Sequence, residues 1–223
     1  FLDSYFKSLK IRKNNTMKTE LLTFNQVIKQ ANNPHLLLGN GFSMAYDSHR
    51  FSFTTLLDSA LKENLIKKED PVYKVFQKLE TADFESVMKI LDETEKIVEV
   101  YEGKDGLQKK IRTDVKNLKK FLVAIITNNH PAKSTDIAVE KKDSCVNFLS
   151  NFTAKNIYTL NYDLLLYWSY ITRLDLGFAD GFGNTKDSLH EGYVVYNQKR
   201  FKVHYLHGGL HLFDKGSDII KET

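Results

Sequence analysis

The chain has 223 residues, of which 42% are hydrophobic, and its 32 basic and 28 acidic side chains give a formal net charge of +4. Such a chain can bury a sizeable core, and its charge is too balanced to indicate a nucleic-acid partner on electrostatics alone, so we do not expect one for this domain. A single cysteine, Cys145, excludes an internal disulfide and a zinc site built from several thiolates. The longest apolar run, residues 121–126, is far shorter than the roughly 20 residues that span a membrane, so we expect a cytoplasmic protein with no membrane partner.

Residues 17–70 are expected to form the first part of an α/β domain. Apolar residues at helical spacing predict a helix near 21–28 and another near 53–61, with a buried strand at 36–38 between them. Gly39 and Gly41 follow this strand. They allow a close approach of the backbone and a positive φ, and the N-terminus of the next helix attracts anions, so a pyrophosphate is the natural ligand. An ordinary tight turn explains the two glycines equally well.

Two nucleotide-binding classes are disfavoured at this loop. The dehydrogenase fingerprint needs a third glycine at position 44, where the chain has Met44. A phosphate-binding P-loop needs a Gly-Lys-Ser/Thr ending, which is absent. We therefore expect neither a hydride-transferring Rossmann enzyme nor an NTPase.

Residues 71–130 are expected to form an all-helical insert, because apolar residues recur at helical spacing throughout and no strand pattern is present. The opposite face of the second long helix carries five basic residues. Such a face could hold phosphates or nucleic acid but is more often simply solvated. These residues are Lys109, Arg112, Lys116, Lys119 and Lys120.

Residues 131–223 return to alternating strand and helix patterns and are expected to form the second part of the α/β domain, C-terminally incomplete. Together with the first part they predict a Rossmann-like, mostly parallel sheet with helices on both faces. Asn161 and Asp163 follow the strand at 156–160, and His207 follows the strand that begins near 203. The carboxyl ends of parallel strands line the ligand crevice, so these residues are placed for chemistry. Asp163 also suits a helix N-cap.

Three histidines, at 204, 207 and 211, lie close together in the sequence. They could hold a metal ion, but no carboxylate or thiolate completes the set, and a strand followed by a turn does not present this spacing on one face. A single histidine acting as a base is the preferred interpretation, and we expect no metal.

Three segments in this order, "LLGNGFS" (37–43), "TLNYD" (159–163) and "LHG" (206–208), resemble the sirtuin-like NAD-binding family. The resemblance is to its divergent bacterial branch, whose members hydrolyse NAD in antiphage defence. It implies that Asn161 and His207 are catalytic, with His207 as the base. It also implies NAD as substrate, held by Gly39, Asn40, Gly41, Phe42, Ser43, Asp163, Asp180 and Gly208.

The resemblance has departures that bear on activity. The family's deacylases carry a four-cysteine zinc ribbon, which a chain with one cysteine cannot build, so hydrolysis of NAD to nicotinamide and ADP-ribose is favoured over protein deacylation. A catalytically silent module that senses NAD or ADP-ribose and regulates a partner is the alternative.

The activity of an NADase has to be controlled. The helical insert is the candidate for this control, either as a lid over the cleft or through a contact with a second copy or a partner subunit. Thr81 and Glu85 are expected to cap its first long helix. The apolar face of that helix, with Phe84, Val87, Met88 and Leu91, is expected either to make this contact or to be ordinary core.

Overall fold

The computed structural model describes residues 21–102, 106–153, 155–182, 189–190, 193–196, 202–216 and 218–222. The chain divides into two units, residues 1–34 and 35–223. In the first unit, helix α2 (Phe24–Gln30) begins after Thr23, whose hydroxyl accepts from the Gln26 N–H while the Gln26 side chain accepts from the Thr23 N–H. No helix among the described residues has the length and apolar character needed to cross a membrane.

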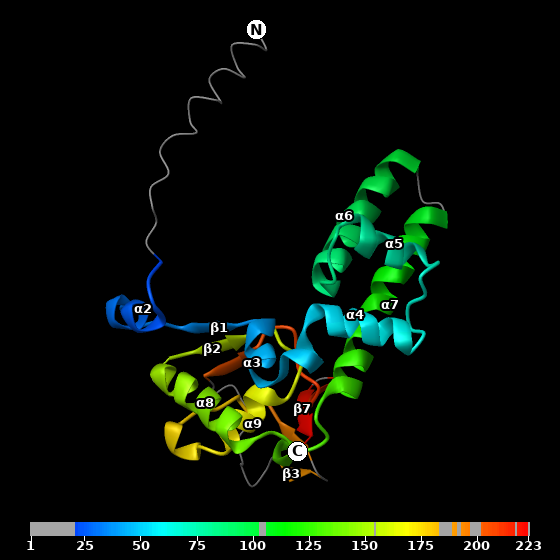
Figure 1. Ribbon diagram of the computed structural model, residues 1–223. Helices are drawn as coiled ribbons and strands as arrows, with labels where there is room; N and C mark the ends of the chain where they lie inside the picture. Colours follow the sequence, from blue (N-terminus) through cyan, green and yellow to red (C-terminus); the bar gives the residue numbers. More distant parts are fainter. Residues whose placement is uncertain are drawn as a thin grey trace, which may run out of the picture. The chain divides into compact units, whose positions relative to one another are not determined.

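The second unit contains a three-stranded parallel sheet (Figure 1). Its strands are β1 (Leu36–Leu38), β2 (Ile157–Thr159) and β5 (Val203–Tyr205), in the order β1-β2-β5. Leu36 pairs with Ile157, which in turn pairs with Val203, so the carboxyl ends of all three strands meet at one edge. The segments after these strands carry the glycine loop, Asn161, Asp163 and His207, which the topology therefore brings to that edge.

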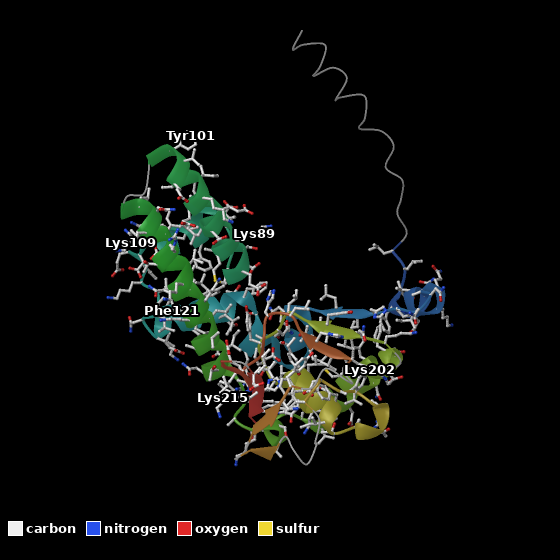
Figure 2. All side chains as sticks on the ribbon, turned by 180° about the vertical axis from the view of Figure 1, so that it is seen from behind. Lys89, Tyr101, Lys109, Phe121, Lys202 and Lys215 are labelled. Carbon is white, nitrogen blue, oxygen red and sulfur yellow. The ribbon has the colours of Figure 1, made fainter. Side chains whose placement is uncertain are left out.

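Helices α3 (Asn40–Phe51), α8 (Val139–Leu149) and α9 (Leu165–Ile171) accompany this sheet, with short 3₁₀ turns η2 (Ser134–Asp136), η3 (Ser150–Phe152) and η4 (Leu174–Leu176). Figures 1 and 2 show α8 and α9 on one side of the sheet. Leu38 and Val203 are buried, whereas Leu37 points to the opposite face and is 61% exposed. The expectation of helices on both faces is therefore not met at β1.

The predicted all-helical insert is present as α5 (Pro71–Lys78), α6 (Phe84–Glu102) and α7 (Gly106–Asn129). The long antiparallel pair α6 and α7 extends away from the sheet, and Lys89, Tyr101, Lys109 and Phe121 mark it in Figure 2. The core of the insert also includes residues of α4 (Phe53–Lys62), such as Leu56 and Ala60. Helix α4 therefore packs with the helices of the insert, although the sequence analysis assigned it to the first part of the α/β domain.

Helix α6 does not begin as predicted. Asp83, not Thr81, caps it, because the Asp83 carboxylate accepts from the Glu85 N–H at 2.9 Å and from the Ser86 hydroxyl at 2.6 Å. The four residues of its predicted contact face are at most 8% exposed within one chain; these are Phe84, Val87, Met88 and Leu91. This face is core, so a lid or oligomer contact through these four side chains is ruled out.

The last part of the chain differs most from expectation. Strands β3 (Leu189–His190), β4 (Tyr193–Val195), β6 (Leu212–Lys215) and β7 (Asp218–Glu222) form a separate sheet in the order β3-β4-β7-β6. All of its pairings are antiparallel. The protein is therefore mixed α/β, as expected, but its strands do not form one mostly parallel sheet. Short connections explain the difference, since a hairpin joins antiparallel strands whereas parallel strands need a long crossover.

Candidate functional site at the carboxyl edge of the parallel sheet

Asn161 links the segments that follow β1 and β2. Its Nδ2 donates one hydrogen bond to the carbonyl oxygen of Gly39 at 3.0 Å and one to Oγ of Ser43 at 2.7 Å. The Asn161 backbone N–H is held in turn by the Thr159 hydroxyl at 3.1 Å. The asparagine predicted as catalytic is thus fixed against the glycine loop, and the carbonyl oxygen of its side chain is the acceptor that it can offer a ligand.

Ser43 and Asp163 complete this cluster beneath the surface, at 1% and 5% exposure. The Ser43 hydroxyl donates to Oδ2 of Asp163, and Oδ1 of Asp163 accepts from the Leu165 N–H at 2.9 Å. Burial raises the pKa of the Asp163 carboxyl, and the hydrogen bond from Ser43 opposes this rise. Both side chains have partners within the cluster, which hold the loop in place, and their contact with a cofactor stays a prediction.

His130 is a site-forming residue that the sequence did not reveal. Its Nε2 accepts from the Leu164 N–H at 3.0 Å, so Nδ1 carries the ring proton and donates to the Pro131 carbonyl at 2.8 Å. Burial lowers the pKa of the His130 imidazole, which favours this neutral form. Its ring packs edge-on against Trp168 at 4.7 Å between centroids. His130 thereby joins the end of α7 to the loop that carries Asp163. The one sequence signal that could have indicated this role is the position of His130 directly before Pro131.

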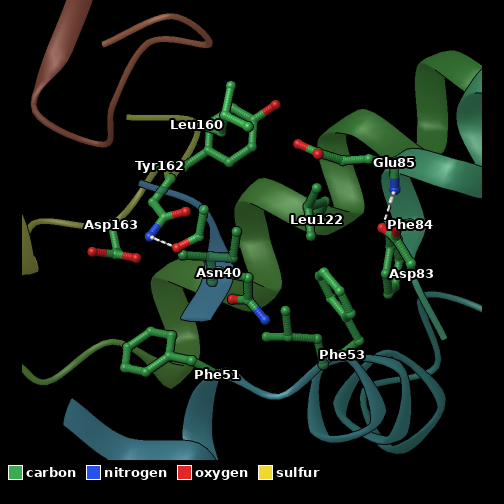
Figure 3. A pocket seen from close by; sticks show the side chains of 14 residues that line it. Asn40, Phe51, Phe53, Asp83, Phe84, Glu85, Leu122, Leu160, Tyr162 and Asp163 are labelled. Atoms are coloured by element: carbon green, nitrogen blue, oxygen red, sulfur yellow. Dashed lines mark hydrogen bonds between the residues drawn. The ribbon is translucent and has the colours of Figure 1, made fainter. Parts of the chain in front are cut away.

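A cavity of about 230 Å³ opens beside the cluster, between the sheet edge and the insert (Figure 3). Figure 3 shows Asn40 among Phe51, Phe53 and Leu122. The Nδ2 atom of Asn40 is buried and has no hydrogen-bond partner among the residues that the structure describes. A buried donor without a partner costs roughly 1–3 kcal/mol, and such a group in a native structure calls for an explanation. An acceptor atom of a bound ligand would supply the missing partner.

His207 lines a neighbouring cavity of about 510 Å³, which shares Glu85, Leu122 and Tyr162 with the first. Its ring lies 5.9 Å from that of Tyr162, between centroids. Its Nδ1 is 3.2 Å from Oε1 of Glu85 on α6. Gly208, which follows it, has φ +82°, a conformation that favours glycine and turns the chain away from β5. The structure therefore places His207 next to the Asn161 cluster, in an adjoining part of one cleft.

Two other predicted cofactor residues face elsewhere. Gly41 and Phe42 line a separate groove of about 580 Å³ against α8, while Gly39 borders both this groove and the cavity beside Asn161. Neither loop glycine has the predicted positive φ, because Gly39 has φ −115° and Gly41 lies inside α3. The helix starts at Asn40, with only Gly39 between it and the strand, so the chain turns without left-handed backbone.

Asp180 belongs to a different buried group. It accepts from Nζ of Lys221 at 2.8 Å and from the Tyr170 hydroxyl at 2.7 Å. The cavity residues do not include it. Because a buried carboxylate needs such partners, its role in the fold is explained without a cofactor.

The other two histidines do not join His207. The His204 ring stacks on Tyr158 at 4.6 Å between centroids, and His211 stacks on Tyr167 at 4.9 Å. Burial, with Lys221 nearby, lowers the pKa of His211 to about 4. In the part of the chain that the structure describes, no three His, Cys, Asp or Glu side chains come together as a metal site.

The fold and this edge define a mixed α/β protein with a polar cluster and a cleft between a parallel sheet and a helical insert. A family model described as a domain of unknown function, DUF4917, matches residues 36–223, and the chain belongs to this family. The match begins at the first residue of β1 and includes every residue of the cleft. No curated protein matches the chain.

Proposed function

We propose that this chain hydrolyses NAD to nicotinamide and ADP-ribose, as a regulated NAD-depleting effector in bacterial defence. The proposal includes a Rossmann-like, sirtuin-like origin for the β1-β2-β5 sheet and its helices. The convergence of Gly39, Ser43, Asn161 and Asp163 at one sheet edge carries it. These residues come from two of the three segments that resemble the family, and the third segment supplies His207 in the adjoining cavity.

The dimensions and polarity of the cleft support a ligand of this kind. The smaller cavity alone, at about 230 Å³, falls below the range of roughly 300–1,000 Å³ usual for ligand sites. With the adjoining cavity of about 510 Å³, the cleft comes within that range. The side-chain oxygen of Asn161 and the unpartnered Nδ2 of Asn40 offer an acceptor and a donor to ribose hydroxyls.

The reaction breaks the bond between C1′ of the ribose and the nicotinamide nitrogen. Nicotinamide leaves as a neutral molecule with the electron pair of that bond, and positive charge develops on the ribose. A water molecule adds to C1′ and gives up its proton to His207. The protein has to hold the ribose in place, which Asn161 can do, and to receive that proton near neutral pH, which a histidine can do.

The direct test is chromatography of NAD after incubation with the full chain. Equal amounts of nicotinamide and ADP-ribose are expected, because one bond is cleaved and water is added. An inactivated sample of the protein is the negative control, and NADP in place of NAD is the comparison substrate. If NAD binds without any product forming, the alternative sensing module becomes the better account. If NAD neither binds nor reacts, both functions fail.

Gly39 offers a separate test of where the ligand lies. Its added Cβ would meet no atom within 4 Å and its φ of −115° suits any residue, so Gly39→Val is expected to fold. The valine side chain would occupy space beside the loop, and NAD affinity is expected to fall about tenfold or more, a loss of about 1.4 kcal/mol or more. Titration calorimetry measures the change.

Two further glycine variants sharpen this test. Gly106→Val, on α7, also adds a Cβ that meets no atom within 4 Å, and it should leave NAD affinity unchanged. Gly41→Val fills the groove against α8 instead. A loss of affinity in Gly41→Val but not in Gly39→Val would place the ligand in that groove and contradict the proposed site.

A further inference from the structure

We propose that Glu85, on the helical insert, is the positioning residue of His207, so that the insert supplies part of the reacting centre. This rests on the proposed hydrolysis of NAD, in which His207 receives the proton. The contact joins residues far apart in the sequence, one in the first turn of α6 and one directly after β5.

The position of Glu85 is well defined by its surroundings. Its backbone N–H donates to the Asp83 carboxylate at 2.9 Å, a hydrogen bond drawn in Figure 3. Its neighbours Phe84 and Val87 are at most 1% exposed in the core of the insert. Figure 3 shows the Glu85 carboxylate extending from α6 toward Tyr162. The insert therefore holds this carboxylate over the cleft, where it borders both cavities.

The contact determines which ring nitrogen of His207 can act. An ionised carboxylate only accepts hydrogen bonds, so at 3.2 Å from Oε1 the Nδ1 atom of His207 is the donor. In the neutral ring the lone pair then lies on Nε2, which becomes the atom that takes a proton. When it does, the negative charge of Glu85 compensates the imidazolium. A base oriented by a third group is the arrangement common to many hydrolytic sites.

Other groups around His207 do not replace Glu85 in this role. Tyr162 contacts the ring from the loop after β2, and Lys119 of α7 lines the same cavity. Lys119 is a cation and can only donate, so it cannot accept from Nδ1. Glu85 is the one carboxylate among the residues that line this cavity in the described chain.

The first experiment reads the tautomer of His207 without any substrate. The full chain is labelled with ¹⁵N-histidine, the His207 signals are assigned by their loss in His207→Gln, and the ring nitrogens are observed above pH 8. In the wild type, Nδ1 is expected to carry the proton. In Glu85→Ala, the ring should shift toward the Nε2–H form, and in Glu85→Gln, whose side-chain oxygen still accepts, the wild-type form should persist. Glu93→Ala, an exposed glutamate on the same helix, should change nothing.

The second experiment separates kcat from KM for NAD. Glu85→Ala is expected to lower kcat about tenfold or more, a part of the roughly 100- to 10,000-fold contributed by a general base, with KM changed less than about twofold. Glu85→Gln should recover part of this loss, since it keeps the hydrogen bond and lacks the charge.

The outcomes distinguish this inference from the proposed function. An Nε2–H ring in the wild type, or the same tautomer in Glu85→Ala, overturns the positioning role whatever the activity. If the tautomer responds to Glu85 but no preparation cleaves NAD, the proposed function fails and the Glu85–His207 contact stands. Unchanged kcat in Glu85→Ala, in a protein that does cleave NAD, also overturns the role of Glu85 in the reaction.

Discussion

His207→Ala is expected to lower the rate of NAD cleavage by about 100- to 10,000-fold, the usual contribution of a general base. The reason is that the proton released by the attacking water would have no acceptor at the reacting centre. The fold should be unaffected, because the His207 side chain is 39% exposed and its hydrogen bond to Glu85 lies at the surface of the cleft. Turnover is measured as nicotinamide released, and NAD affinity by calorimetry should change little.

Two comparisons make this result specific. His49→Ala removes an exposed histidine from α3 and should leave turnover at the wild-type level. Asn161→Ala should also abolish turnover, but by a different route. It removes the two hydrogen bonds to Gly39 and Ser43, so NAD affinity should fall as well. Full activity of His207→Ala in a protein that cleaves NAD would remove His207 from the mechanism.

Lys221→Met is expected to lower the free energy of unfolding by about 3–5 kcal/mol, the usual cost of removing one partner from a buried ion pair. Lys221 and Asp180 are 7% and 5% exposed, with their charged atoms 2.8 Å apart. The lysine Nζ also lies 4.8 Å from the centre of the Tyr167 ring. Without Lys221, the buried Asp180 carboxylate keeps the Tyr170 hydroxyl and the Phe182 N–H as hydrogen-bond partners but loses its cationic partner. Urea denaturation measures the loss.

The double variant Asp180→Asn with Lys221→Met tests the cause. It removes both charges, so it should recover part of the stability that Lys221→Met loses. Lys116→Met, at an exposed position of α7, should leave stability within about 0.5 kcal/mol. The double variant also decides the role of Asp180, because unchanged NAD affinity would assign Asp180 to the fold alone. A loss of affinity in a stably folded double variant would support the sequence-based prediction that Asp180 contacts the cofactor.

The sequence by itself determined the elements whose signals are local. The strand at 36–38, the glycine loop leading into a helix, and the helical insert follow from apolar spacing and from the placement of glycines, which act within a few residues. The prediction that this strand is buried holds for Leu38 but not for Leu37, which is 61% exposed. The placing of Asn161, Asp163 and His207 after strands also needed only local patterns. The rule that parallel strands end at one edge then predicts that they gather there.

Only the tertiary structure decided which side chains meet. The contacts of Asn161 with Ser43, of His130 with the Asp163 loop, and of Glu85 with His207 join distant segments, and no local period encodes them. It also turned Gly41 toward α8, placed Asp180 beside Lys221 and separated the antiparallel sheet from the parallel one. The physical reason is the same throughout. Periodicity states which face of an element is buried, whereas the partner on that face depends on how the whole chain packs.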